Sequence, residues 1–265
     1  MKIIFFGDIV GRIGREAIPL AISDLKASHD PDLIIANAEN IAHGKGVTAK
    51  TLQELVDAGV DLFTTGNHVW RNKEVFSVMS DKQLGDRLIR PANYPADVPG
   101  QGSKMLTIAT KNVLVLNLLG RVYGNDLVND PFRTFDDILL SHAAQKPSVI
   151  LVDIHAEATS EKVALGWYAA GRASAVWGTH THVPTADARV LPGGTAYITD
   201  AGMCGYKDGV LGITKEPIIN NFRTQLPVTH EIPVAGDAIV SAVITTVDAA
   251  GRATDIESWQ RTYNL

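Results

Sequence analysis

The amino-acid sequence predicts an α/β fold. Short apolar runs typical of strands alternate, through about residue 180, with segments whose apolar residues recur at helical spacing. Five of the apolar runs end directly in polar side chains that can bind metal. Because ligands collect at the carboxyl ends of strands in α/β sheets, the same pattern predicts a functional site at that edge.

The strands are predicted from apolar runs that glycine, proline or polar residues bound on both sides. In chain order they are residues 2–6, 32–37, 61–65, 113–118, 148–154, 173–178 and 195–199, followed by a hairpin within residues 236–260. The turn of the hairpin is expected at residues 248–251, because Gly251 suits a turn.

The first helix is predicted by Ile18, Ile22 and Leu25, which share one helical face. Pro19 lies within this segment, and a proline inside a helix removes one hydrogen bond and clashes with the preceding turn. We therefore expect Pro19 in the first turn of the helix or at a kink.

The next helices are predicted from their end signals. Residues 48–58 carry an apolar face, and Gly59 just beyond them is expected to end that helix. Asn72 is expected to cap a short helix that follows it. Asp130 and Pro131 are expected to open another helix, since proline is favoured at the first helical position.

The remaining segments suggest how the chain is organised. Residues 85–102 contain three prolines and predict a connecting excursion. The strands added late to an α/β beginning suggest a second, mixed sheet that packs on the first. Since the chain shows no repeat, low-complexity tract or linker, we expect a single domain over residues 1–265.

Composition restricts the class of protein. The 265 residues are 45% hydrophobic and 20% charged, as expected for a globular protein, and no apolar run approaches the ~20 residues that span a bilayer. The single cysteine, Cys204, excludes an internal disulfide and fits a cytoplasmic location. A net charge of −5 argues against a nucleic-acid polymer as ligand, whereas a small anionic substrate at a cationic metal centre is compatible.

The polar groups at the strand ends predict a metal centre. They supply eight oxygen and imidazole side chains: Asp8, Glu39, Asn40, Asn67, His68, His155, His180 and His182. One catalytic metal takes only three or four protein ligands, so the number indicates two metals. Two metals close together suit in-line displacement at phosphorus or hydrolysis of a peptide.

His180 and His182 form the strongest single pair in this set. Alternation along an extended segment would place both imidazoles on one side of the chain, where they could serve one cluster.

The same residues carry a family resemblance. Residues 66–68 and 178–182 resemble the GNH and GH-x-H blocks of the calcineurin-like metallophosphoesterases, and Asp8 and His155 fall in the expected order with them. The resemblance extends from residue 1 to about Thr214. It implies a four-layer α/β/β/α sandwich of two mixed sheets.

Two departures from the common pattern narrow the resemblance. Val10 replaces the histidine of the usual D-x-H block, and Glu39 with Asn40 replaces the second acidic block. Together with residues 155–162 and 191–197, these departures resemble a bacterial subfamily of 2′,3′-cyclic-nucleotide 2′-phosphodiesterases with a di-iron or related binuclear centre.

The resemblance also implies a role for each site residue. It implies that Asp8, Asn40 and His182 bind one metal, that Asn67, His155 and His180 bind the other, and that Glu39 bridges both. It further implies that a metal-bound hydroxide attacks phosphorus while His68 acts as the general acid, giving 3′-nucleotides. The oxygen and nitrogen ligands suit iron, which the subfamily favours, or manganese or zinc.

The other histidines are assigned lesser roles. His43 follows the Glu39–Asn40 segment closely, and we interpret it as a substrate-binding residue. His29, His142 and His230 are expected at the surface. The glycine-rich segments 120–124 and 202–207 are interpreted as loops, either ordinary ones or loops at the mouth of the site.

Three alternatives to a cyclic-nucleotide phosphodiesterase remain open at this point. One is a phosphomonoesterase or nucleotidase that uses the same centre. Another is a regulatory protein with structural metals and only vestigial activity. The third is a dinuclear peptidase, which the histidine blocks do not resemble. The expected partner is a small-molecule phosphodiester and not a membrane, and the sequence allows a homo-oligomer.

Overall fold

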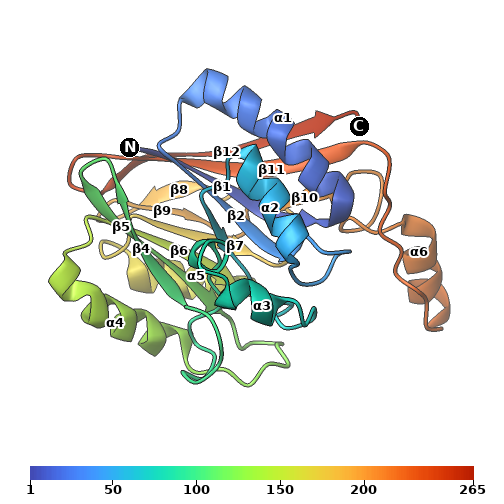
Figure 1. Cartoon of the computed structure of the whole chain (residues 1–265), viewed down its shortest axis with the longest axis horizontal. Helices are drawn as coiled ribbons and strands as arrows, with labels where there is room; N and C mark the ends of the chain where they lie inside the picture. Colours follow the sequence, from blue (N-terminus) through green and yellow to red (C-terminus); the bar gives the residue numbers. More distant parts are fainter.

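Two six-stranded mixed sheets pack face to face in the computed structural model, which describes all 265 residues (Figure 1). The strand order of the first sheet is β12 (Ala253–Tyr263), β11 (Ala238–Val247), β10 (Met203–Tyr206), β1 (Lys2–Val10), β2 (Leu33–Asn40) and β3 (Leu62–Thr64). The order of the second sheet is β4 (Ser103–Ile108), β5 (Lys111–Leu119), β6 (Val149–His155), β7 (Ala175–Thr179), β9 (Thr195–Ile198) and β8 (Arg189–Leu191).

Helices cover the outer faces of the two sheets, which confirms the predicted four-layer α/β/β/α architecture (Figure 1). The first sheet is covered by α1 (Gly11–His29), α2 (Ala49–Ala58) and α3 (Val75–Ser80), and the second by α4 (Pro131–His142) and α5 (Thr159–Ala169). Two 3₁₀ turns, Gly85–Arg87 and Ala143–Gln145, and the projecting helix α6 (Lys215–Thr224) complete the elements. None of the helices has the length and apolar character to cross a membrane.

Alternation along β1 explains why the first sheet is buried on both faces. Ile4 and Phe6 pack under the helices, whereas Ile3 and Phe5 face the second sheet. Between the sheets the Phe5 ring stacks on Trp177 of β7, with 4.6 Å between the ring centroids. This shared core supports the expectation of one domain, which remains a prediction.

Several local signals in the sequence act as predicted. Gly59 ends α2 with a left-handed φ of 104°, and Thr48, the first residue of the predicted helix, caps it through the backbone N–H of Thr51. Asp130 caps α4 by accepting hydrogen bonds from the backbone N–H groups of Phe132 and Arg133. These signals depend only on neighbouring residues, so the sequence reveals them directly.

Two local predictions differ from the structure. Pro19 lies in the middle of α1 and not in its first turn, because the helix already begins at Gly11, where β1 ends; a kink at Pro19 stays a prediction. Asn72 does not cap α3, since its side chain accepts the backbone N–H of Glu74, and Glu74 occupies the cap position. Each of these predictions infers where a helix begins from a single residue. In the structure the preceding strand or turn determines where the helix begins.

The origin of the second sheet also differs from the prediction. The predicted late hairpin exists as β11 and β12, but β11 pairs antiparallel with β1 and so extends the first sheet. The second sheet comes from the middle of the chain. Residues 202–207, interpreted as a loop, contain β10, a buried strand parallel to β1. Strands β4, β8 and β10 and helices α5 and α6 were not predicted. Strands β8 and β10 have three and four residues and are too short for a period to show.

Candidate metal centre

The carboxyl ends of two groups of parallel strands meet at one edge of the sandwich. Strands β1, β2 and β3 run parallel in the first sheet, and β5, β6 and β7 run parallel in the second. All eight ligand candidates predicted from the sequence lie at this edge and contact one another, so the structure brings the whole predicted set together.

A β-bulge at Gly7 directs Asp8 toward the second sheet. The register between β1 and β2 shifts between Phe6 and Asp8. Phe6 and Ile9 consequently both lie on the helix side, and Asp8 falls on the opposite side. A Cβ atom on residue 7 would overlap the carbonyl oxygen of Gly202, and that oxygen accepts the backbone N–H of Asp8 at 3.0 Å. The bulge therefore requires glycine.

Alternation along β2 places Glu39 on the same side as Asp8. Ile34, Ala36 and Ala38 pack under the helices, so Glu39 faces the second sheet and is 1% exposed. Asn40, the last residue of the strand, is also buried. The strand prediction ended at residue 37, and the structure shows that the two polar residues are part of the strand.

His68 follows β3 and is held by Glu39. Its backbone N–H donates to Glu39 Oε2 at 3.0 Å. Its Nδ1 atom lies 2.8 Å from Asn40 Oδ1 and 3.3 Å from Glu39 Oε1. The contacts of Nδ1 leave Nε2 as the ring nitrogen that is available to a substrate.

A hydrogen-bond chain beneath His155 determines its tautomer. The Thr179 hydroxyl donates to Asp153 Oδ1 at 2.7 Å, and Thr179 Oγ1 lies 2.9 Å from His155 Nδ1. Because the hydroxyl has only one proton and gives it to Asp153, it accepts from Nδ1–H of His155. The Nε2 atom of His155 therefore presents a lone pair to the site.

His180 and His182 reach the site by a different path from the one predicted. Their φ angles are 102° and 65°, so both lie in the left-handed region and not in an extended segment. Thr181 between them donates its backbone N–H and its hydroxyl to Asp200 Oδ2, at 3.1 and 2.7 Å. The buried Lys162 ammonium lies 2.7 Å from the same oxygen and also donates to the Thr179 carbonyl. This buried ion pair holds the strained turn in place.

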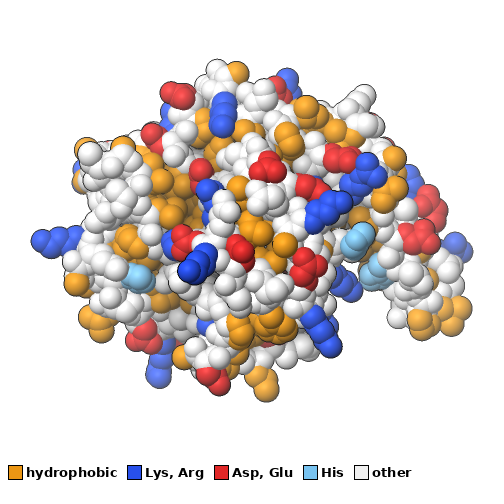
Figure 2. Space-filling model, in the orientation of Figure 1, with side chains coloured by type: hydrophobic (Ala, Val, Ile, Leu, Met, Phe, Trp, Pro, Cys, Tyr) orange, Lys and Arg blue, Asp and Glu red, His pale blue; other side chains and the backbone are white.

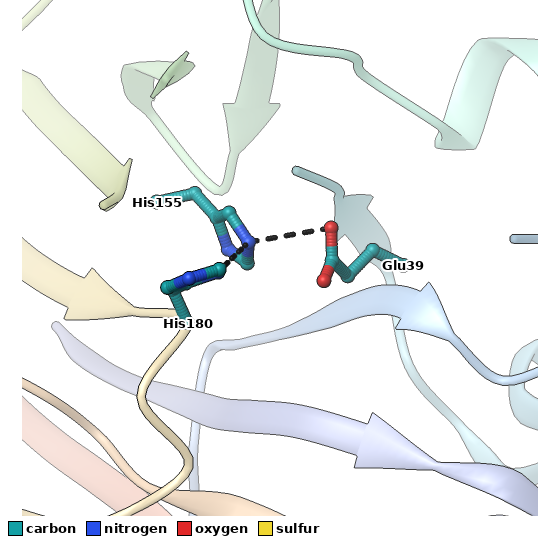
Figure 3. Close-up of side chains that lie close together, drawn as sticks. All are labelled: Glu39, His155 and His180. Carbon is teal, nitrogen blue, oxygen red and sulfur yellow. Dashed lines mark hydrogen bonds and ion pairs between the residues drawn. The ribbon is translucent and has the colours of Figure 1, made fainter. Parts of the chain in front are cut away.

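One group of ligand atoms converges on His155 Nε2. This atom lies 3.0 Å from His180 Nδ1, 3.1 Å from Asn67 Oδ1 and 3.3 Å from Glu39 Oε2. Figure 3 shows the side chains of Glu39, His155 and His180 pointing toward one another, and their ligand atoms all lie within 4.8 Å. His180 Nε2 lies 3.0 Å from Glu157 Oε2, so its proton belongs there and its Nδ1 faces the group as a lone pair.

A second group lies on the other side of Glu39. His182 Nε2 is 3.9 Å from Asp8 Oδ1 and 3.4 Å from the Asn40 amide, which in turn is 3.1 Å from Glu39 Oε1. His182 Nδ1 donates to the Leu211 carbonyl, so its Nε2 also carries a lone pair. Asp8 Oδ1 is the one buried side-chain oxygen or nitrogen in the chain that has no hydrogen-bond partner.

The pKa shifts indicate that the cluster favours positive charge at its centre. Burial opposes protonation of His155, but the carboxylates of Glu39 and Asp8 outweigh burial and raise its pKa to about 9. Burial alone would raise the pKa of Glu39, but His155 and His68 hold it well below the ordinary value. Burial, with the neighbouring His155, lowers the pKa of His180 to about 4. A proton on His155 or a bound cation would supply the charge.

The residues fit a metal centre. A buried carboxylate oxygen without a hydrogen-bond partner lies near imidazole nitrogens whose lone pairs face one another. Too few protons are present to satisfy all of these acceptors, and a bound cation would satisfy them. The donors are carboxylate, amide and imidazole without thiolate, which suits iron, manganese or zinc.

A cavity of about 850 Å³ opens beside the second group. His43, Lys45, His68 and His182 are among the residues that line it, so the structure places His43 near the centre, as expected for a substrate-binding residue. His29 and His142 lie at the ends of α1 and α4, as predicted. The prediction of a plain surface position for His230 is incomplete, because His230 also lines this cavity.

Sequence reasoning missed the residues that support the ligands. Asp200 directly follows the predicted strand 195–199, so the strand-end signal that revealed Asp8 could also have revealed it. Asp153 is an acid inside a predicted buried strand, which is a second usable signal. Lys162 belongs to a segment that carried the resemblance, but no pattern indicated that its ammonium would be buried.

Known proteins resemble the chain over nearly its whole length. The sequence matches the family described as YmdB-like protein over residues 4–259. A 2′,3′-cyclic-nucleotide 2′-phosphodiesterase of Bacillus subtilis (strain 168) is 46% identical over 257 residues, covering 97% of this chain and 96% of that protein. The crystal structure of a Mycoplasma pneumoniae phosphatase superposes with a TM-score of 0.91 at 35% identity, covering 99% of this chain and 93% of the other.

A more distant neighbour shows the fold alone. The 5′-nucleotidase precursor of Thermus thermophilus has a TM-score of 0.59 at 12% identity, covering 98% of this chain and 54% of the other. The two chains therefore share the sandwich fold.

The buried ion pair under the histidine turn leads to a stability prediction. Lys162→Met leaves Asp200 buried without its cation, so we expect the free energy of unfolding to fall by about 3–5 kcal/mol. The exposed Lys50→Met is the matched control and should cost less than about 1 kcal/mol. Chemical denaturation followed by circular dichroism measures both, and equal losses in the two variants would contradict a structural role for the pair.

Proposed function

The chain belongs to the YmdB-like family, and from this membership we propose that it is a metal-dependent phosphodiesterase that hydrolyses 2′,3′-cyclic nucleotides to 3′-nucleotides. The observation that carries the proposal is the division of the ligand atoms into two groups that share the two oxygens of Glu39. This division supports a binuclear centre, and the name of the B. subtilis relative supports the substrate class.

We propose that each group of ligand atoms holds one ion. Asp8, Asn40 and His182 would hold one, and Asn67, His155 and His180 the other, with Glu39 between them. Asn40 would present its carbonyl oxygen after a half-turn of its side-chain amide. Two ions in such a site supply a water-derived nucleophile and neutralise charge on the phosphoryl oxygens. Iron is the proposed metal, with manganese or zinc as alternatives.

The binuclear proposal predicts the number of metals. Metal-replete protein should contain two ions per chain, roughly 3–4 Å apart as in other two-metal hydrolases. Elemental analysis and an anomalous diffraction map measure the number and the separation. A single ion, or ions that do not contact both Asp8 and His180, would sink the binuclear proposal.

The charge of the cavity supports a diester over a monoester. Lys45 is its single lysine or arginine, whereas a dianionic monoester would call for more cationic side chains. A cyclic diester carries one negative charge, which asks less of the protein. The phosphomonoesterase alternative is therefore second to the proposed diesterase.

The substrate prediction follows from this comparison. Metal-replete protein should hydrolyse 2′,3′-cyclic AMP faster than 3′,5′-cyclic AMP or p-nitrophenyl phosphate, because a ribose held in one orientation presents only one of the two scissile bonds. Product analysis should give 3′-AMP, and chelation should abolish turnover. If the monoester reacts fastest, the monoesterase alternative replaces the proposal. If no ester reacts, the alternative of a regulatory protein replaces the proposal.

We propose that His68 is the general acid. It lines the cavity, its Nδ1 is engaged by Asn40 and Glu39, and its side chain is 26% exposed. The half-turn of the Asn40 amide proposed above would bring its NH₂ group to His68 Nδ1, so that Nδ1 accepts and the ring proton lies on Nε2. From there the proton can pass to the departing 2′ oxygen, a role that imidazole suits near neutral pH.

The role of His68 can be separated from metal binding. His68→Ala should keep both metals but lose about 10²–10⁴ in kcat toward diesters with poor leaving groups. The loss should shrink for bis(p-nitrophenyl) phosphate, whose leaving group needs little protonation. Steady-state kinetics with both substrates and elemental analysis give the comparison. Lost metal, or equal losses for both substrates, would show that His68 has another role.

A cytoplasmic location is also part of the proposal. The single cysteine, Cys204, is buried, and burial raises the pKa of its thiol. An inert thiol without a partner for a disulfide supports a reducing compartment.

A further inference from the structure

Two cavities border the candidate metal centre, and His180 lines both of them. The larger, about 850 Å³, is lined by His68 and His182, and the smaller, about 200 Å³, by Asn67 and the loop that follows β5. His68 lines the larger cavity and not the smaller one. If His68 protonates the 2′ oxygen, as the proposed function requires, the ribose and its base must lie on the side of the larger cavity.

The larger cavity is closed on one side by the excursion between β10 and β11, residues 207–237. Hydrogen bonds hold it at three places: the Lys207 N–H donates to the Asp237 carbonyl, the Thr214 N–H donates to the Glu231 carbonyl, and the Leu211 carbonyl accepts from His182. Figure 2 shows histidine side chains where the projecting α6 segment leaves the body of the protein. The first two bonds close the excursion on itself, and the bond from His182 joins it to the metal centre.

Ile232 joins the excursion to the loop that follows β2. A Cβ atom on Gly44 would overlap the Ile232 side chain, and a Cβ atom on Gly11 would lie 2.6 Å from it. Both glycines have positive φ angles, and His43 beside Gly44 has a φ of 51°. The close contact brings His43 and the excursion to the same cavity.

The lining has the chemistry that a nucleobase needs. The excursion contributes apolar side chains, Ile213, Val228 and Ile232, together with the imidazole of His230, and the loop after β2 contributes the imidazole of His43. A base has two flat, weakly polar faces and a polar edge. Imidazole and other aromatic rings stack on such faces, and apolar side chains exclude water from them.

We propose that residues 207–237 form the base-binding side of the active site, with His230 and His43 in contact with the nucleobase of the substrate. The inference rests on the proposed function for the orientation of the ribose. It extends that function by assigning recognition of the nucleoside to a segment distinct from the metal ligands. The excursion selects nucleoside diesters over small diesters.

The test compares ligands with and without a base. His230→Ala and His43→Ala should each weaken binding of 3′-AMP by about 5- to 100-fold, the range for one base-stacking side chain, but leave the affinity for inorganic phosphate within about twofold. Isothermal titration of metal-replete protein measures both ligands. The variants should also lose more kcat/KM for 2′,3′-cyclic AMP than for bis(p-nitrophenyl) phosphate. Both histidines are exposed, so both variants should fold.

Tyr123→Ala is the matched control, because this 84% exposed aromatic residue lies at the smaller cavity. The inference is overturned if neither histidine variant discriminates the two ligands, if Tyr123→Ala does so instead, or if the unmodified protein binds 3′-AMP no better than phosphate. A protein that binds 3′-AMP through His230 but hydrolyses no cyclic nucleotide would keep the base site and reject the proposed function. If the two histidine variants show no selective loss of affinity for 3′-AMP but hydrolyse 2′,3′-cyclic AMP rapidly, the base site is rejected and the proposed function is kept.

Discussion

At the edge where the two sheets meet, buried carboxylate oxygens and imidazole nitrogens present more lone pairs than there are protons to bind them. This constraint organises the rest of the structure. Asp8 Oδ1 has no hydrogen-bond partner, and the lone pairs of His155 and His180 face each other at 3.0 Å. Buried groups of this kind destabilise a protein unless positive charge accompanies them. The carboxylates accordingly raise the pKa of His155. Two sheets have to end at one place for the ligands to share such a charge.

Two buried acids that are not ligands control the geometry of the imidazoles. Asp153 acts through Thr179 on the ring of His155, and Asp200 acts through Thr181 on the turn between the other two histidines. Each acid is satisfied by donors from elsewhere in the fold, in the case of Asp200 by a buried lysine. Such outer contacts determine which ring nitrogen carries the proton, and thus which one can bind a metal.

The excursion after β10 connects the metal centre to the cavity. Its Leu211 carbonyl orients His182, while its later residues, among them Ile232, line the space beside His68. One segment therefore contributes both to the tautomer of a ligand and to the shape of the space for the substrate. This arrangement lets the cavity lining vary in chemistry while the ligands from the strands stay in place.

The sequence by itself determined the elements and ligands that depend on near neighbours. Gly59 ends its helix as predicted, and the polar residues that end apolar runs, such as Asp8, all lie in the cluster. Only the tertiary structure decided the pairing of β11 with β1 and the left-handed backbone of His180. A strand's partner depends on contacts far away in the chain, and a strained turn persists only where distant groups hold it. Local patterns carry neither kind of information.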